Sequence, residues 1–85
     1  MLAVQYRYNA VSQARRVLYA CGLLRRAGCR VLAASAVGAP RIRVDRRPRL
    51  DWIEPARKVT APTWGIFAAR VDGIQIEWTE QRHLI

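Results

Sequence analysis

The pair Asp72-Gly73 lies between two runs of residues, WGIFAARV and IQIEWTE, that have the composition of β-strands. Aspartate followed by glycine is favoured in the two-residue type I′ turn of a β-hairpin. Counting outward from this turn pairs only apolar residues on one face: Val71 with Ile74, Ala69 with Ile76, and Phe67 with Trp78. Because a shift of one residue would move every side chain to the other face, this agreement sets the register. The sequence therefore predicts strands over residues 64–71 and 74–79.

Residues 10–27 have the periodicity of an amphipathic helix. Asn9 suits the N-cap, where a side-chain oxygen accepts from the free amides of the first turn, and Gly28 suits the left-handed residue that ends a helix. At about 100° per residue, one arc holds small and apolar residues: Val11, Ala14, Val17, Leu18, Cys21 and Leu24. The other side holds Arg15, Arg16, Tyr19 and Arg26. We expect the first arc to be buried and the second to face solvent, with Arg25 nearer the buried arc.

The middle of the chain predicts short strands separated by turns. Residues 30–37 are rich in small and β-branched residues, and residues 41–45 alternate apolar with charged side chains. Three prolines make residues 46–63 mainly a loop, within which Arg57 to Thr60 fit a short edge strand. The predicted fold is a single α+β domain over residues 1–85, with one N-terminal helix packed on an antiparallel meander of three to five strands.

Positive charge is concentrated in the first part of the chain. Residues 1–50 contain eleven arginines and one acid, Asp45, and so carry a formal charge of +10, whereas residues 51–85 carry −1. Fourteen arginines to one lysine is the usage that a GC-rich genome produces, but codon usage does not account for the absence of acids before Asp45. Such asymmetry indicates a surface for an anionic partner, either nucleic acid or an acidic protein.

Residues that support catalysis or metal binding are scarce. The lone histidine, His83, is the third residue from the C-terminus, where a general base is poorly positioned. Cys21 is expected in the core, and Cys29 is expected to be partly exposed beside Arg30, which would lower its pKa; no disulfide between them is expected. Asp51 and Glu54 are close in sequence to several arginines, so we expect them to form ion pairs and not to act as a general acid or base. We therefore expect no enzymatic activity, no metal and no cofactor.

The candidate binding residues follow from the charge pattern. Arginine matches phosphate oxygens two at a time, and tyrosine or tryptophan offers a plane for stacking or a partner contact. The predicted helix face is extended by arginines around the second strand and by one tryptophan in the loop. The candidate set is Arg15, Arg16, Tyr19, Arg26, Arg41, Arg43, Arg46, Arg47, Arg49 and Trp52.

Two segments resemble a class of short prophage-borne accessory proteins. That class shares R-P-x-I-x-V followed by V-x-G-x-x-V-x-W near the C-terminus, and the patterns fall here on Pro40–Val44 and Val71–Trp78. The resemblance implies a mobile-element accessory protein and carries no catalytic residues with it.

Two functions remain open from the sequence. In the first, a non-catalytic basic protein contacts the nucleic-acid backbone, with little sequence selectivity, through the arginine-rich helix face. In the second, the same arginines serve a protein-directed inhibitor of a host system, such as an anti-CRISPR or other anti-defence protein, on an acidic host surface. Arg15 and Arg16 interrupt the only candidate signal-peptide region, and the longest apolar run is far too short to cross a bilayer. The expected location is the cytoplasm of a bacterial host, with no membrane partner.

Overall fold

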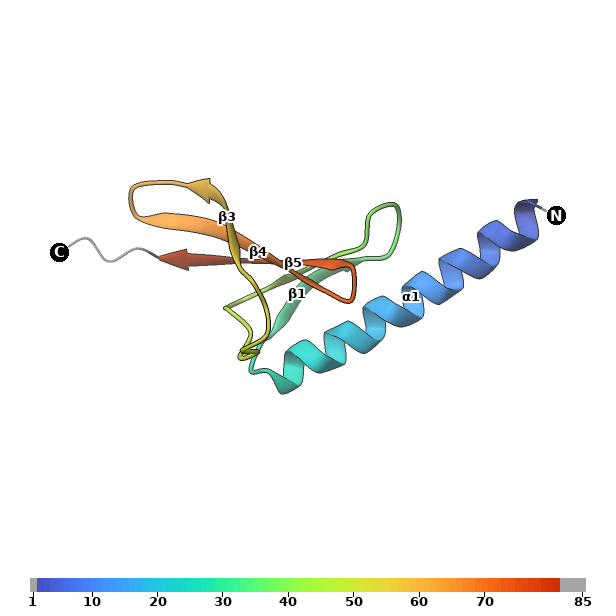
Figure 1. Ribbon diagram of the computed structural model, residues 1–85, viewed down its shortest axis with the longest axis horizontal. Helices are drawn as coiled ribbons and strands as arrows, with labels where there is room; N and C mark the ends of the chain where they lie inside the picture. The colour runs from blue at the N-terminus through green and yellow to red at the C-terminus, as the bar shows by residue number, and fades with distance from the viewer. Residues whose placement is uncertain (1, 82–85) are drawn as a thin grey trace.

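The computed structural model describes the backbone of residues 2–81 and the side chains of residues 11–81. One helix precedes five strands (Figure 1), and this order confirms the predicted α+β class. The elements are α1 (Leu2–Arg26), β1 (Val31–Ser35), β2 (Arg41–Val44), β3 (Ala56–Thr60), β4 (Trp64–Val71) and β5 (Ile74–Gln81). The strands form one sheet in the order β1-β2-β5-β4-β3.

The β4–β5 hairpin has the predicted register. Asp72 and Gly73 have φ angles of 52° and 75°, as a type I′ turn requires. Phe67 pairs with Trp78, and the two rings stack with centroids 6.2 Å apart. The apolar face of this hairpin shares one core cluster with the buried residues of the helix. The pattern around one dipeptide therefore located both the turn and the core face.

The sheet is mixed rather than an antiparallel meander. β2 pairs antiparallel with β1 but parallel with β5, with Ile42 opposite Ile76. The expectation of antiparallel pairing throughout was therefore wrong for β2. The alternation of arginine with apolar residues in RIRV predicts which side chains of the strand are buried. It does not predict the direction of the neighbouring strand, because side chains alternate in the same way beside a parallel or an antiparallel partner. The amide of Gln75 donates to the carbonyl of Pro40 at 3.2 Å and extends this parallel pairing.

The predicted loop over residues 46–63 contains a strand. β3 spans Ala56–Thr60 and pairs antiparallel with β4, which confirms the short edge strand expected near Arg57. Pro55 and Pro62 bound it on either side, and every residue of β3 is exposed. The loop is thus confined to the segment between β2 and β3 and to the turn before β4.

Helix α1 begins earlier and buries less than predicted. It starts at Leu2, so Asn9 lies inside the helix and is not its N-cap. No proline or glycine precedes Asn9, and an interior asparagine costs only a few tenths of a kcal/mol, which does not stop a helix. Val11 and Leu18, expected in the core, are exposed, the latter at 71%. The helix meets the sheet along a narrower arc, formed by Val17, Ala20, Cys21 and Leu24.

The end of α1 matches its prediction. Gly28 has a φ of 89°, Cys29 N–H donates to Leu24 O at 3.0 Å, and Gly28 N–H donates to Arg25 O at 3.1 Å. These bonds form a Schellman motif, which satisfies carbonyls left free at the helix end. The chain then turns back beneath the sheet, and Leu24, Ile42, Ile74, Ile76 and Trp78 close the core. Within the described residues, no helix is long and apolar enough to span a membrane.

Candidate nucleic-acid interface

The arginines of the first fifty residues fall into two groups. Arg16, Arg43, Arg46 and Arg47 each have a carboxylate oxygen within 4.0 Å. Among the residues whose side chains the structure describes, the others have no ion pair: Arg15, Arg25, Arg26, Arg30, Arg41 and Arg49. All six are exposed. This division separates arginines that already have a carboxylate nearby from arginines whose donors all remain available to a ligand.

Arg47 belongs to a cluster on the sheet. Its Nε and Nη2 donate to the Oε2 of Glu80 at 2.9 and 2.7 Å, and its guanidinium lies 5.6 Å from the Phe67 ring centroid and 5.8 Å from that of Trp78. Trp78 Nε1 also donates to Glu80 at 2.6 Å. Burial tends to raise the pKa of Glu80, but hydrogen bonds from Trp78 and Arg47 outweigh it and hold that pKa below its ordinary value. Arg47 was predicted as a binding residue, and its donors are instead occupied within the fold.

Arg16 is occupied as well. Its Nη2 donates to the carbonyl of Asp72, and its Nε lies 3.5 Å from the Asp72 carboxylate. The guanidinium also lies against Gly73, where an added Cβ would come within 3.2 Å of Nη2. Arg16 therefore joins the helix to the hairpin turn and has little capacity left for phosphate.

Asp45 organises the residues that follow β2. Its Oδ1 accepts from the backbone amide of Arg30 at 2.7 Å, and its Oδ2 lies 3.2 Å from Arg46 Nη2. The backbone hydrogen bond from Arg30, with the nearby Arg46, lowers the pKa of Asp45. Arg46 is thus partly neutralised by its neighbour in the chain.

Arg15, Tyr19 and Arg26 share the outer side of α1. Arg15 and Tyr19 are one turn apart, and Arg26 lies about 16 Å from Arg15 along the axis at 1.5 Å per residue. Tyr19 is 69% exposed, so its ring is open to a stacking partner. The guanidinium of Arg26 lies close to Gly22 on the same helix, since an added Cβ at Gly22 would be 3.8 Å from Nη1 of Arg26. These three predicted residues lie together as expected.

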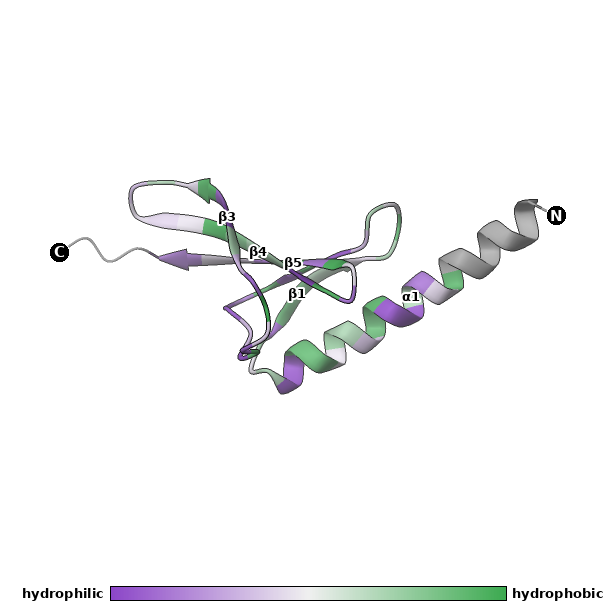
Figure 2. Ribbon diagram, in the orientation of Figure 1, coloured by the Kyte–Doolittle hydropathy of each residue, from purple (hydrophilic) through white to green (hydrophobic). Residues whose placement is uncertain are grey.

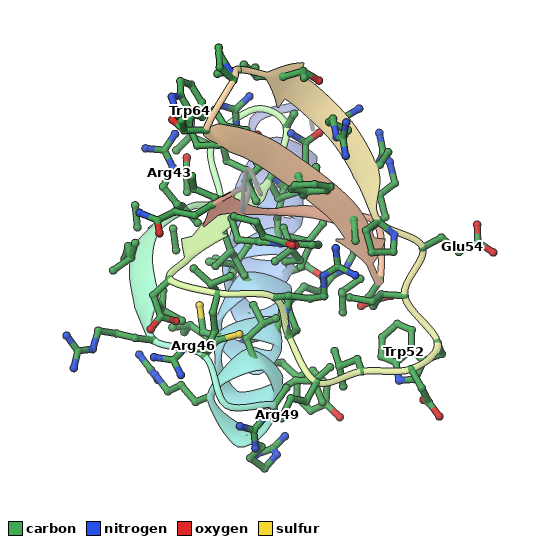
Figure 3. All side chains as sticks on the ribbon, turned by 90° about the vertical axis from the view of Figure 1, so that its left-hand side faces the viewer. Arg43, Arg46, Arg49, Trp52, Glu54 and Trp64 are labelled. Atoms are coloured by element: carbon green, nitrogen blue, oxygen red, sulfur yellow. The ribbon has the colours of Figure 1, made fainter. Side chains whose placement is uncertain are left out.

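The C-terminal end of α1 adds charge that the sequence interpretation partly missed. Arg25 is exposed and not directed toward the core. The helix ends in two arginines, which give it a hydrophilic tip directly after an apolar stretch (Figure 2). Arg49 comes from the loop after β2: its amide donates to Ala27 O at 3.0 Å, and its Nε approaches Gly28 (Figure 3). Two facts available in the sequence favoured Arg25, namely its place in the last helical turn and the absence of acids nearby. We call Arg15, Tyr19, Arg25, Arg26 and Arg49 the basic surface.

The remaining candidates lie elsewhere. Arg41 and Arg43 project from β2 on the sheet face opposite the helix, and Arg43 Nη2 is 3.9 Å from Glu77. Trp52 is 57% exposed and lines a pocket of about 360 Å³ with Glu54, Lys58 and Arg70. The ten candidates therefore do not form one continuous site.

The two cysteines both lie in the core of the structure. Cys29 is buried, its Sγ donates to Arg46 O at 3.3 Å, and burial together with Asp45 raises its pKa. The expected partial exposure and lowered pKa of Cys29 were wrong, because the turn after the Schellman motif carries its side chain into the core. Cys21 and Cys29 are both free thiols. No cluster suited to a metal ion occurs among the described residues, and His83 lies outside them.

Residues 10–79 match the model of the Kil protein family. The chain therefore belongs to the Kil protein family, and it is a small phage-encoded accessory protein. No curated protein and no solved structure matches it.

Proposed function

We propose that this phage protein is a non-catalytic binding protein that contacts the nucleic-acid backbone through the basic surface, in the cytoplasm of the bacterial host. The observation that carries the proposal is that four exposed arginines of this surface have no carboxylate partner among the described side chains. Their guanidinium groups keep their hydrogen-bond donors available, and phosphate oxygens match the arginine fork.

The arrangement favours backbone contacts over base recognition. The exposed arginines of α1 lie on both sides of Leu18 and Tyr19 along a single helix, whereas the helix-turn-helix motif places a second helix in the major groove. A tyrosine ring among arginines can stack on an unpaired base of any identity. We therefore expect weak sequence preference and a strong dependence of affinity on salt.

The test is a salt titration of binding to fluorescently labelled duplex and single-stranded DNA. Each phosphate neutralised on duplex DNA contributes about −0.9 to the slope of log K against log salt. The triple variant Arg15→Ala, Arg26→Ala, Arg49→Ala should lower the affinity for all sequences alike and make the slope less steep by two to three units, roughly one per lost contact.

The matched control removes the same charge from the opposite sheet face. The variant Arg41→Ala, Lys58→Ala, Arg70→Ala loses three exposed cations that have no ion pair within the described residues. It should retain most of the wild-type affinity. Equal losses in both triple variants would mean that net charge alone attracts DNA, and no binding at about 50 mM salt would reject the proposal.

A second candidate is a protein-directed inhibitor of a host system, including an anti-CRISPR or other anti-defence protein. The observation that favours it is the exposure of Leu18 on the outer side of α1, next to Tyr19 and close to Arg15. Tyrosine and arginine are enriched at the centres of protein interfaces, and the exposed side chain of Leu18 beside them adds apolar area that a partner can bury. A host protein that stays bound at high salt, and is released by Leu18→Ser but not by the triple arginine variant, would support this function instead.

A further inference from the structure

The two edges of the sheet are built differently. β3 forms one edge with Arg57 and Lys58 exposed, and prolines stand immediately before it and shortly after it. Charged side chains and prolines are the usual means by which proteins keep an edge strand from pairing with another chain. β1 forms the other edge with the sequence VLAAS, which contains neither a charge nor a proline. One edge is protected against strand addition and the other is open to it.

β1 is accessible along most of its length. Residues 32–35 are all exposed, with Leu32 at 56%, and within the described residues 2–81 β1 pairs with β2 alone. Its pairing is irregular between Val31 and Ala33 and regular from Ala33 to Ser35, opposite Arg43, Ile42 and Arg41. In a strand paired on one side, alternate backbone N–H and C=O groups point away from the partner. These groups, beside small alanine side chains, can form the hydrogen-bond ladder of an added strand.

A groove beside this edge carries positive charge. It has a volume of about 280 Å³ on the sheet face opposite the helix and is lined by Ala33, Ala34, Ser35, Arg41, Arg43 and Glu77. Arg41 has no ion pair among the described residues, and the Arg43–Glu77 contact at 3.9 Å is long and exposed on the arginine side. The side chains of an added strand alternate between the two faces of the sheet, so every second one would face this groove.

We propose that β1 is a docking edge for an extended acidic peptide segment of a partner protein, which pairs with Ala33–Ser35 and directs carboxylates toward Arg41 and Arg43. Charge complementarity selects this occupant. A second copy of this chain, with the same two arginines and a formal charge of +9, would bring like charges together along the shared edge. The site is distinct from the basic surface, so it does not rest on the proposed nucleic-acid function.

The first experiment measures binding of a short synthetic peptide with glutamate at alternate positions and valine or threonine between them. A peptide with lysine in place of each glutamate is the charge control. The glutamate peptide should bind at least about tenfold more tightly, and hydrogen exchange should slow at the amides of β1 and not at those of β3. Exchange that slows elsewhere, or equal binding of both peptides, overturns the proposal.

Charge reversal tests the two arginines. The double variant Arg41→Glu, Arg43→Glu should reverse the preference, so that it binds the lysine peptide more tightly than the glutamate peptide. The matched control Lys58→Glu, Arg70→Glu makes the same charge change on β3 and β4, away from β1. It should keep the wild-type preference. A loss of preference in both variants would mean that the peptide responds to net charge, which contradicts docking at β1.

Backbone pairing has its own test, because electrostatic attraction alone needs no peptide hydrogen bonds. Two glutamate peptides carry backbone N-methyl groups, one on its odd-numbered residues and the other on its even-numbered residues. Their charges are identical, but each peptide lacks hydrogen-bond donors along a different edge of the strand it would form. Only one phase should lose binding if the peptide adds as a strand. Equal affinity of both phases excludes strand addition. Sedimentation that finds a dimer of the protein, which the glutamate peptide does not dissociate, assigns the edge to a second copy instead.

Discussion

Arg47 and Arg26 have the same side chain in opposite surroundings. Arg47 lies over the Phe67 and Trp78 rings and donates twice to Glu80, whereas Arg26 lies on the outer side of α1 without an ion pair among the described residues. Both belong to the same acid-poor half of the chain, so charge density in the sequence does not distinguish them. The difference teaches that an arginine-rich segment contains residues that stabilise the sheet as well as residues available to a partner.

The largest effect should come from the sheet cluster itself. Trp78→Ala should lower the free energy of unfolding by about 3–5 kcal/mol, because it empties a fully buried site of the core beside the Phe67 ring. Urea unfolding at neutral pH measures this change. Trp64→Ala is the control: Trp64 is on the same hairpin but partly exposed, and its loss should cost much less. Equal costs at the two positions would contradict the placement of the core.

Arg47→Met should cost about 1–2 kcal/mol, the combined size of a partly exposed ion pair and its contacts with two aromatic rings. Methionine retains much of the apolar stem and removes the charge. Arg49→Met makes the same change at a residue without an ion pair, and its unfolding free energy should stay within about 0.5 kcal/mol of wild type. Equal losses of unfolding free energy in the two variants would contradict the claim that Arg47 stabilises the fold and that Arg49 of the basic surface does not.

Acid should weaken the sheet cluster through Glu80. Because the pKa of Glu80 is lower in the folded protein than its ordinary value of 4.5, the stabilisation is complete above pH 4.5. It is lost as the pH falls through the lowered, folded-state pKa. Glu80→Gln should therefore be less stable than wild type at pH 7 and should lose less stability between pH 5 and pH 3. Asp45 titrates in the same direction in both proteins, so the difference between their pH profiles isolates Glu80.

The smallest effect on stability should come from the basic surface. The triple variant Arg15→Ala, Arg26→Ala, Arg49→Ala should unfold within about 1 kcal/mol of wild type, since none of the three exposed side chains has an ion pair among the described residues and exposed substitutions each change stability little. Its melting curve should therefore stay close to that of the wild type, whereas its affinity for DNA should fall strongly. A variant that loses stability as steeply as Arg47→Met would place these arginines among the fold's own contacts.

The candidate site could be predicted only in part, for a reason that these arginines illustrate. Helical spacing correctly grouped Arg15, Tyr19 and Arg26, because residues on one helix are related by local geometry. Spacing could not show that Arg16 reaches Asp72, 56 residues away in the chain, or that Arg47 reaches Glu80. It also could not bring Arg49 to Gly28, since that approach depends on where the loop after β2 crosses the helix end.

The sequence by itself determined the parts of this protein whose geometry is local. The Asp72-Gly73 turn set the hairpin register through its φ angles, and Gly28 ended the helix through a Schellman motif closed within one turn. Only the tertiary structure decided that β2 runs parallel to β5, that Leu18 faces solvent, and that Cys29 is buried. Those outcomes depend on which surfaces meet across long stretches of chain. A pattern of apolar residues states that a face can be buried, whereas packing decides which partner buries it.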